Sequence, residues 1–471
     1  MTSVSANAGD HAVTKAMMPT PASHPRATLI VTVLASTLGF IDASALNVAL
    51  PAIGRDLHAD PAGLQWTINA YWLPLSALLL FGGAAGDHFG RRRILIAGML
   101  LFLIASVGCA FAPDLPALLI ARAIQGVGAA MLIPNSLAIL GSAFTGKARG
   151  KAIGLWAAAG SIGTTLGPLL AGALIENVGW RTIFLINIPV AAGAIVGALH
   201  YVGESRTGGQ VLDWLGAVVV TFALGLVAWA LTDWTGGHGG IVPAAAMAAG
   251  LLAFVVFVLV ENRQGSDAMI PLSMFASKPL VGITLLTFLV YGSLSGFLVL
   301  LPYVLITTAG YTALQMGLAL VPFPLIIGLG SPFAGRAAVA VGSRLPLSIS
   351  PLIVGAGMLL LLRVDADATY LFDVLPAIAV IAIGMAGTAA PLTTAILGAV
   401  DAARTGTASG LNSATSRTGG LIVTALTGTV IARHGPAMID AFHVAAVIGA
   451  VMAGSAALIA YLFLSPFQPE N

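Results

Sequence analysis

Apolar runs long enough to cross a lipid bilayer recur along almost the whole of this 471-residue chain. A membrane-spanning helix needs roughly 20 apolar residues, and about fourteen stretches meet this criterion. Only 8% of the residues are charged, whereas soluble domains carry about 25%. We therefore predict an all-α, multi-pass membrane protein. The predicted spans are residues 29–50, 64–84, 94–112, 116–140, 150–174, 183–202, 214–231, 241–260, 280–304, 313–334, 346–362, 371–397, 405–431 and 441–464.

Composition also narrows the functions open to the chain. The net charge of +2 is too small to indicate nucleic-acid binding. The single cysteine, Cys109, lies in an apolar run, which excludes disulfides and cysteine-based metal sites. The histidines are scattered, without the clustered His, Asp or Glu that a membrane enzyme would need. We expect no metal, no cofactor and no enzymatic activity.

The distribution of basic residues predicts which side of the membrane each loop faces. Cytoplasmic loops carry an excess of Lys and Arg; with the N-terminus inside, only Arg55, Arg181, Arg363 and Arg433 fall in outside loops. An even number of spans then puts both termini in the cytoplasm. Residues 1–27 lack the apolar core and cleavage site of a signal peptide, so we interpret them as a disordered cytoplasmic tail. The inside residues are Lys15, Arg26, Arg91, Arg92, Arg93, Lys147, Arg149, Lys151, Arg206, Arg263, Lys278, Arg336, Arg344 and Arg404.

Sequence echoes divide the chain into two similar halves. Gly154-Leu155 in one Gly-rich span is echoed by Gly410-Leu411 about 256 residues later, as expected of internal repeats. Two spans are left over in the middle. The predicted segments are a tail at 1–27, an N-terminal six-helix bundle at 28–203, a two-helix insertion at 211–262, a C-terminal six-helix bundle at 275–465 and a tail at 466–471.

One carboxylate, Asp42, lies within the first span. A charged side chain at bilayer depth costs about 2.5–3.5 kcal/mol, so it normally faces a water-filled cavity or a partner charge. Arg122 and Arg417 are the basic residues that lie inside spans. We predict that Asp42 pairs with Arg122 in the first half. The alternatives are an acid near enough to the interface to reach water, and an arginine that extends outward along its apolar stem.

Two further stretches have patterns that suggest a role in movement. The first is the tight inner loop from Gly83 to Arg93, in which glycines permit a sharp turn and Asp87 can cap the next helix or pair with an arginine. It also fits a simple positively charged membrane anchor. The second is the span from Gly154 to Gly172, where small residues at three- and four-residue spacing allow two helices to approach closely. Pro168 invites a bend there, so the span suits tight packing, a gating hinge or both.

These stretches resemble motifs of the major facilitator superfamily, in its fourteen-span drug:proton antiporter branch. The resemblance covers nearly the whole chain, although Ala85, Gly86 and Ala171 depart from the family patterns. The first-span motif is similar from Asp42 to Asn47 and at Ala49 and Pro51. The other matching residues are Gly83, Asp87, Gly90, Arg91 and Arg92 in the inner loop; Arg122, Gln125, Gly126, Gly128, Ala129 and Ala130 in the fourth span; Gly154, Gly163, Gly167, Pro168 and Gly172 in the fifth; and Gly406, Ser409, Gly410, Asn412 and Arg417 in the thirteenth.

The resemblance implies a major facilitator fold that exports by alternating access, in exchange for protons. Two bundles would rock about a site near the midplane. Asp42 would bind the proton, with its charge tuned by Arg122, and the loop around Asp87 would latch the inner gate. The fifth-span motif, from Gly154 to Gly172, is associated with antiport.

The substrate is less well defined by the sequence. Asp42 is the one acid placed deep in a span, so lipophilic monocations, neutral compounds or anions fit better than dications. We expect a monomer in a bacterial-type plasma membrane, with partners limited to a small molecule, protons and lipid. A dedicated exporter of one endogenous metabolite or antibiotic shares every motif. The substrate-cavity candidates are Asn47, Gln125, Trp66, Tyr71, Tyr291, Asn412 and Arg417.

Overall fold

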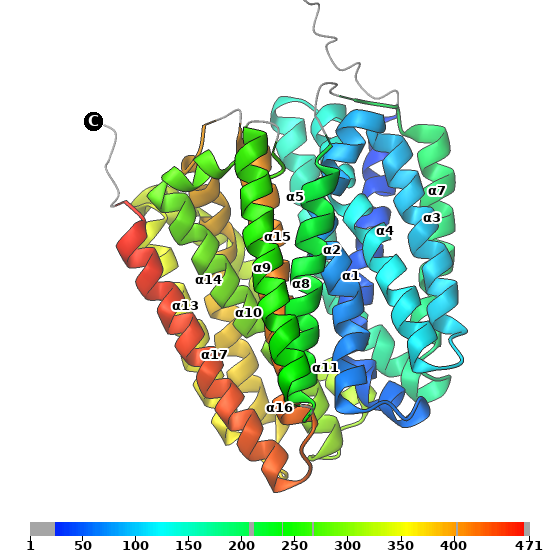
Figure 1. Cartoon of the computed structure of the whole chain (residues 1–471), viewed down its shortest axis with the longest axis vertical. Helices are drawn as coiled ribbons and strands as arrows, with labels where there is room; N and C mark the ends of the chain where they lie inside the picture. Colours follow the sequence, from blue (N-terminus) through cyan, green and yellow to red (C-terminus); the bar gives the residue numbers. More distant parts are fainter. Residues whose placement is uncertain (1–23, 207–211, 238, 266–267, 402–403, 466–471) are drawn as a thin grey trace, which may run out of the picture.

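The computed structural model describes residues 24–206, 212–237, 239–265, 268–401 and 404–465. These residues form helices and short connections, without a β-strand in the described ranges. The predicted tails therefore lie outside the described residues, apart from 24–27, where the first helix begins. Both the first and the last helix have their chain-end termini at the same side of the molecule, at the top of Figure 1. We call this the start side and the opposite side the far side.

The predicted spans agree closely with the helices. Thirteen helices among the described residues are long and apolar enough to cross a membrane, and each coincides with a predicted span. The remaining prediction, 405–431, corresponds to α15 (Thr405–Leu426) and the short α16 (Gly428–Ile431). α15 has 22 residues, enough to cross at about 1.5 Å per residue, but it is rich in Ser, Thr and Asn. It is a polar helix inside the molecule.

The N-terminal bundle lies on the right of Figure 1. Its α1 packs against α4, α5 and α7, and α4 packs against α2 and α3. Side-chain caps begin two of these helices: Asp60 accepts a 2.7 Å hydrogen bond from Gly63 N, and Asp114 accepts one of 2.9 Å from Ala117 N. A proline follows in each first turn, where a missing N–H does no harm. The helices are α1 (Pro25–Asp56), α2 (Pro61–Phe89), α3 (Arg91–Ala110), α4 (Leu115–Ala143), α5 (Gly146–Asn177), α6 (Thr182–Leu185) and α7 (Asn187–Tyr201).

The C-terminal bundle lies on the left of Figure 1. Here α10 packs against α15 and α17, while α14 packs against α12 and α13. Together with α15 and α16, its elements are η2 (Leu272–Ala276), α10 (Lys278–Thr307), α11 (Ala313–Ala319), α12 (Pro322–Val341), α13 (Arg344–Leu360), η3 (Leu361–Arg363), η4 (Tyr370–Val374), α14 (Leu375–Gly398) and α17 (Pro436–Phe463).

The two leftover spans form a helical hairpin in front of the seam between the bundles (Figure 1). It consists of α8 (Trp214–Thr235) and α9 (Ile241–Gln264), which pack against each other. α8 also contacts α2 of the N-terminal bundle and α15 of the C-terminal bundle. The bundles touch each other directly where α2 meets α15, α1 meets α10, and α5 meets α11 and α12.

Candidate functional site

Asp42 of α1 and Arg122 of α4 form an ion pair inside the N-terminal bundle. Arg122 Nη1 lies 2.5 Å from Asp42 Oδ2, and the two side chains are 1% and 2% exposed for Arg122 and Asp42. The pair predicted from the sequence is therefore present. Asp42 does not reach water at an interface, and Arg122 does not extend outward along its stem. Both charges are held in a protein interior.

Neutral polar side chains complete the coordination of this pair. Gln125 Nε2 donates to Asp42 Oδ1 at 2.9 Å, and Gln125 Oε1 accepts from Arg122 Nη1 at 2.6 Å. Asn187 Nδ2, from α7, lies 3.4 Å from the same carboxylate oxygen, and Ser106 Oγ of α3 accepts from Gln125 at 3.0 Å. A buried ion pair is stable only where such bonds satisfy its remaining atoms. Four helices thus converge on one carboxylate.

Aromatic rings cover the guanidinium of Arg122. Its Cζ lies 4.4 Å from the centre of the Tyr71 ring and 5.8 Å from that of Phe184. Its Nε donates to the backbone oxygen of Thr67 at 3.3 Å. A desolvated cation–π contact contributes about 2 kcal/mol. Arg122 therefore keeps several partners in addition to Asp42, so neutralising the carboxylate need not unfold the site.

The glycines of α5 bring that helix against the turn of α1 that carries Asp42. A Cβ added at Gly167 would lie 2.0 Å from Ser44 Oγ and 2.8 Å from Ile41 O; one at Gly163 would lie 3.2 Å from Thr37. Side chains at Gly167 would force the helices apart, because the neighbouring backbone cannot yield easily. Because the two helices are in such close contact, a movement of the α1 turn that carries Asp42 would displace α5.

The next part of α5 contacts the other bundle. A Cβ at Gly172 would lie 2.5 Å from Ala313 O, and one at Gly317 would lie 2.4 Å from Pro168 O. In addition, Leu314 N donates to Glu176 Oε1 at 2.9 Å. The halves are therefore in close contact at the far side. Gly154, nearer the start side of α5, has no atom within 4 Å of an added Cβ.

The inner loop connects α2 to α3 at the start side and contacts α4. Asp87 pairs with Arg91 at 2.7 Å, which is one of the two arrangements expected from the sequence. Arg91 Nη1 also donates to Ala138 O of α4 at 3.3 Å. Gly83 packs against Pro134 of the same helix. These contacts lie within the N-terminal bundle.

The Gly-Arg-Arg part of this loop is held by the segment that follows α7. Gly90 has φ = +111°, a conformation suited to glycine, and a Cβ there would lie 2.6 Å from the carboxylate of Glu204. Glu204 Oε1 accepts a hydrogen bond from Arg92 N at 3.1 Å. The loop is therefore anchored as well as charged.

A second cationic position lies between the bundles. Arg417, on α15, has its Cζ 5.6 Å from the centre of the Trp72 ring on α2. Five residues before it, Asn412 Oδ1 accepts from Thr287 Oγ1 of α10 at 2.6 Å. Both α15 residues are partly buried. Of these two candidates, Arg417 faces α2 across the seam, whereas the hydrogen bond of Asn412 stays within the C-terminal bundle.

The other substrate-cavity candidates are dispersed. Gln125 and Tyr71 are fully buried around the ion pair described above. Asn47, Trp66 and Tyr291 are partly buried on α1, α2 and α10, and Tyr291 packs against the apolar core. The structure thus gathers Tyr71 and Gln125 around Arg122 and leaves the other candidates spread over α1, α2, α10 and α15.

A pair of buried acids lies at the start side of the α8–α9 hairpin. Asp213 and Glu261 are 6% and 0% exposed. Asp213 Oδ1 accepts from Gly216 N and from Gln264 Nε2, at 2.7 and 2.8 Å, and Glu261 Oε2 accepts from Ile270 N at 2.6 Å. The other two carboxyl oxygens are buried without a donor from the described residues. Both converge on Gly216, where an added Cβ would lie 2.1 Å from Asp213 and 2.7 Å from Glu261.

This arrangement fits a single proton shared between the two carboxyl groups, since like charges at such a site cannot both ionise readily. The predicted span ended at residue 260, whereas α9 continues to Gln264 and includes Glu261. A signal was present: Asp213 precedes one span and Glu261 ends the next, so an antiparallel hairpin brings them to the same side.

We expect Glu261→Gln to keep wild-type thermal stability and Glu261→Ala to lose it. The amide nitrogen of Gln can donate to Asp213 in place of the shared proton, whereas Ala leaves buried groups unpaired at about 1–3 kcal/mol each. Thermal unfolding of the purified protein in detergent at neutral pH measures the difference. Equal destabilisation by both substitutions would contradict a shared proton.

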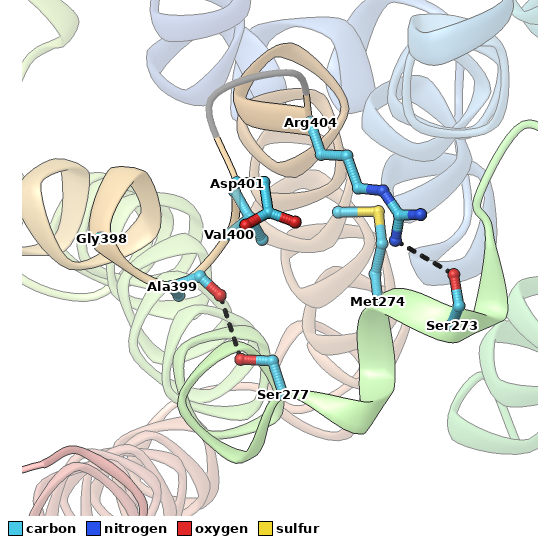
Figure 2. A pocket seen from close by; sticks show the side chains of 8 residues that line it. All are labelled: Ser273, Met274, Ser277, Gly398, Ala399, Val400, Asp401 and Arg404. Atoms are coloured by element: carbon cyan, nitrogen blue, oxygen red, sulfur yellow. Dashed lines mark hydrogen bonds between the residues drawn. The ribbon is translucent and has the colours of Figure 1, made fainter.

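A small pocket at the start side lies apart from these sites (Figure 2). It encloses about 300 Å³ between η2, the end of α14 and the beginning of α15. Arg404 Nη1 donates to Ser273 Oγ at 3.1 Å on one wall, and Ser277 Oγ donates to Ala399 O at 3.0 Å on the other. Its polar lining and its place at helix ends separate it from the ion pair and from Arg417.

Comparison with known proteins agrees with this architecture. The family model described as "Major Facilitator Superfamily" matches residues 32–276 and 283–471. The chain belongs to the major facilitator superfamily. The break between the matched segments falls at the beginning of α10, where the C-terminal bundle starts. A solved structure of the POT family transporter PepTSo has the same fold, with a TM-score of 0.70, 15% identity, and coverage of 93% of this chain and 97% of that one.

Several curated relatives of this superfamily member are resistance proteins. "Multidrug resistance protein Stp" of Mycobacterium tuberculosis is 34% identical over 86% of this chain and 75% of its own length. "Tetracenomycin C resistance and export protein" of Streptomyces glaucescens is 30% identical over 88% and 78% of the two chains. "Methylenomycin A resistance protein" of Bacillus subtilis is 30% identical over 93% and 94%.

Proposed function

We propose that the chain is a proton-coupled efflux transporter that exports lipophilic small molecules by alternating access. One observation carries the proposal: the buried carboxylate of Asp42 is ion-paired to Arg122 on a helix turn that packs against α5. α5 in turn contacts the opposite bundle through Gly172. A titratable group is thereby linked by direct packing to the contact between the two halves. Superfamily membership and relatives named for multidrug resistance support the direction of transport.

The start side is assigned to the cytoplasm. The excess of Lys and Arg in the loops of that side supports this orientation, which places both termini inside the cell. Bacterial relatives support a plasma-membrane location. The far side, where α5 meets α11, is then the outer side, and in this conformation its contact between the bundles is made.

The proposed cycle begins with a proton that reaches Asp42 from the outer side. Neutralising the carboxylate removes its electrostatic attraction to Arg122, which keeps Gln125 and the Tyr71 ring as partners. The turn that carries Asp42 can then shift against Gly167 of α5, and the contact of α5 with α11 changes with it. Release of the proton to the cytoplasm restores the ion pair. One charge crossing 100 mV contributes about 2.3 kcal/mol, so inward proton flow can drive export.

The loop around Asp87 is proposed to support the inner gate. Its contacts with α4 and with the segment after α7 hold the start-side ends of the N-terminal bundle as one rigid unit. A rigid unit is what a rocking motion of whole bundles requires.

The range of substrates has two proposed forms. The first is a broad set of lipophilic drugs, which the multidrug relatives support. The second is one antibiotic or endogenous metabolite, which relatives named for tetracenomycin C and methylenomycin A support. Both forms share the ion pair and the antiporter-type helix.

Export by inside-out vesicles tests the proposed function. We expect at least one compound from a panel of lipophilic cations, neutral drugs and organic anions to enter the vesicles when a pH gradient is imposed, and entry to stop when the gradient is collapsed. Vesicles from cells without the protein supply the background. A panel that moves equally with and without the gradient would contradict proton coupling. Transport of one compound alone would favour the dedicated exporter.

A further inference from the structure

Arg417 is a cation at mid-depth with no ion-pair partner among the described residues. It lies near the middle of α15, and no carboxylate of the described chain is within 4 Å of it. Its Nε atom is buried and has no hydrogen-bond acceptor. Asp42, the acid inside the first helix, is already ion-paired with Arg122. The charge of Arg417 therefore needs a counter-ion that the described chain does not supply.

An uncompensated arginine inside a membrane protein is expensive, and such residues are kept where they meet a substrate or an ion. Burying a charge without a partner costs more than burying a pair. Arg417 lies where α15 contacts α2, so its unpaired charge is at the seam between the two bundles. Alternating access requires the substrate to bind at this seam.

The neighbours of Arg417 indicate what kind of group would lie beside it. Trp72 presents its ring 5.6 Å from the guanidinium and is only partly buried. A cation beside an aromatic ring matches a flat molecule that carries one acidic group.

We propose that Arg417 and Trp72 form a recognition site for aromatic organic anions, with the carboxylate or phenolate of the substrate on Arg417 and its ring system against Trp72. This inference rests on the proposed export function and narrows its substrate class. A guanidinium binds a carboxylate through two parallel hydrogen bonds, which a neutral or cationic analogue cannot form. The site would therefore select charge as well as shape.

Three matched probes test the proposal: 1-pyrenebutanoate, its primary amide and 1-pyrenebutylamine, which share a ring and a linker and differ in charge. Binding to the purified full-length protein is measured by fluorescence, and export is measured in inside-out vesicles with a pH gradient. We expect the wild-type protein to bind the carboxylate most tightly. Arg417→Gln should weaken carboxylate binding about ten-fold or more, since a hydrogen bond to a charged group is lost, and should change amide binding by less than about three-fold.

Two control variants separate charge at the site from charge in general. Arg417→Lys keeps the cation and should retain most of the preference for the carboxylate. Arg404→Gln removes a positive charge from the start of the same helix, where the side chain is exposed and bonded to Ser273; it should leave all three affinities unchanged. An Arg417→Gln effect of equal size on all three probes, or no effect, would overturn the inference.

The two measurements also distinguish failure of the inference from failure of the proposed function. If the carboxylate binds selectively but no probe moves with the gradient, the site stands and proton-driven export is wrong. If the amine or amide is exported and bound more tightly than the carboxylate, export stands and the anion site is overturned. Should Arg417→Gln fail to fold, the wild-type order of affinities among the three probes decides the question.

Discussion

Asp42→Asn is expected to reduce export to the rate measured without a pH gradient. The asparagine side chain has the size of aspartate and can still accept a hydrogen bond from Arg122, but it cannot bind and release a proton. The loss of a charged partner should lower stability by about 1.5–3 kcal/mol, which leaves a folded protein for the assay. Exchange of substrate across vesicles without a gradient should continue, because it does not use the proton.

The matched control is Asp56→Asn, at the far-side end of the same helix. Asp56 is about half exposed and pairs with Arg181 at the surface, and surface ion pairs contribute little. This variant should export at close to the wild-type rate. Full gradient-driven export by Asp42→Asn would remove the carboxylate from the coupling mechanism.

Gly317→Ala should open the far side and slow transport. Its Cβ would lie 2.4 Å from the backbone oxygen of Pro168, and a backbone atom cannot move aside without separating α11 from α5. Overpacking of this kind costs about 1–3 kcal/mol. It destabilises only the conformation in which the two halves are in contact. The equilibrium should therefore shift by about 5- to 150-fold toward conformations in which they are apart.

Distances between labels measure this shift directly. Val178 follows α5 and is 69% exposed, and Ala437 is exposed in the first turn of α17. The native Cys109 is fully buried, so spin labels would attach to cysteines introduced at those two positions. Gly317→Ala should lengthen the main distance between them. Gly328→Ala on α12, where an added Cβ has no atom within 4 Å, should leave it unchanged; the same distances in both variants would contradict the gate.

The sequence allowed most of the fold to be predicted because apolar length is a strong signal. All fourteen spans were predicted from it, including the one that contains α15, although Ser, Thr and Asn lower the hydropathy of that helix. The Asp42–Arg122 pair could be predicted for a related reason: so few charges lie inside spans that the pairing choices are few. The far-side contact between α5 and α11 could not be predicted. The glycines of α5 indicate that another helix packs closely against it, but not which helix.

The rest of the site was harder to predict because its members are neutral. Asn187 and Ser106 look like isolated polar residues in apolar runs, and only the fold brings them to Asp42. Gln125 was expected in the substrate cavity, yet it bonds to both members of the ion pair. Trp72 rather than Trp66 lies beside Arg417, since residues six apart on an α-helix point to different faces.

The position of α8 limits the routes by which lipophilic compounds could pass from the lipid into the space between the two bundles. Thr235, at its far-side end, donates to Ala425 O of the C-terminal bundle at 3.0 Å and lies 3.4 Å from Gln65 of the N-terminal bundle. Along its length α8 covers the line where α2 meets α15. A molecule dissolved in the bilayer therefore cannot pass between α2 and α15 on this flank, because α8 lies in the way. For the proposed exporter, cargo taken up from the lipid would therefore have to enter by a flank other than the one that α8 covers.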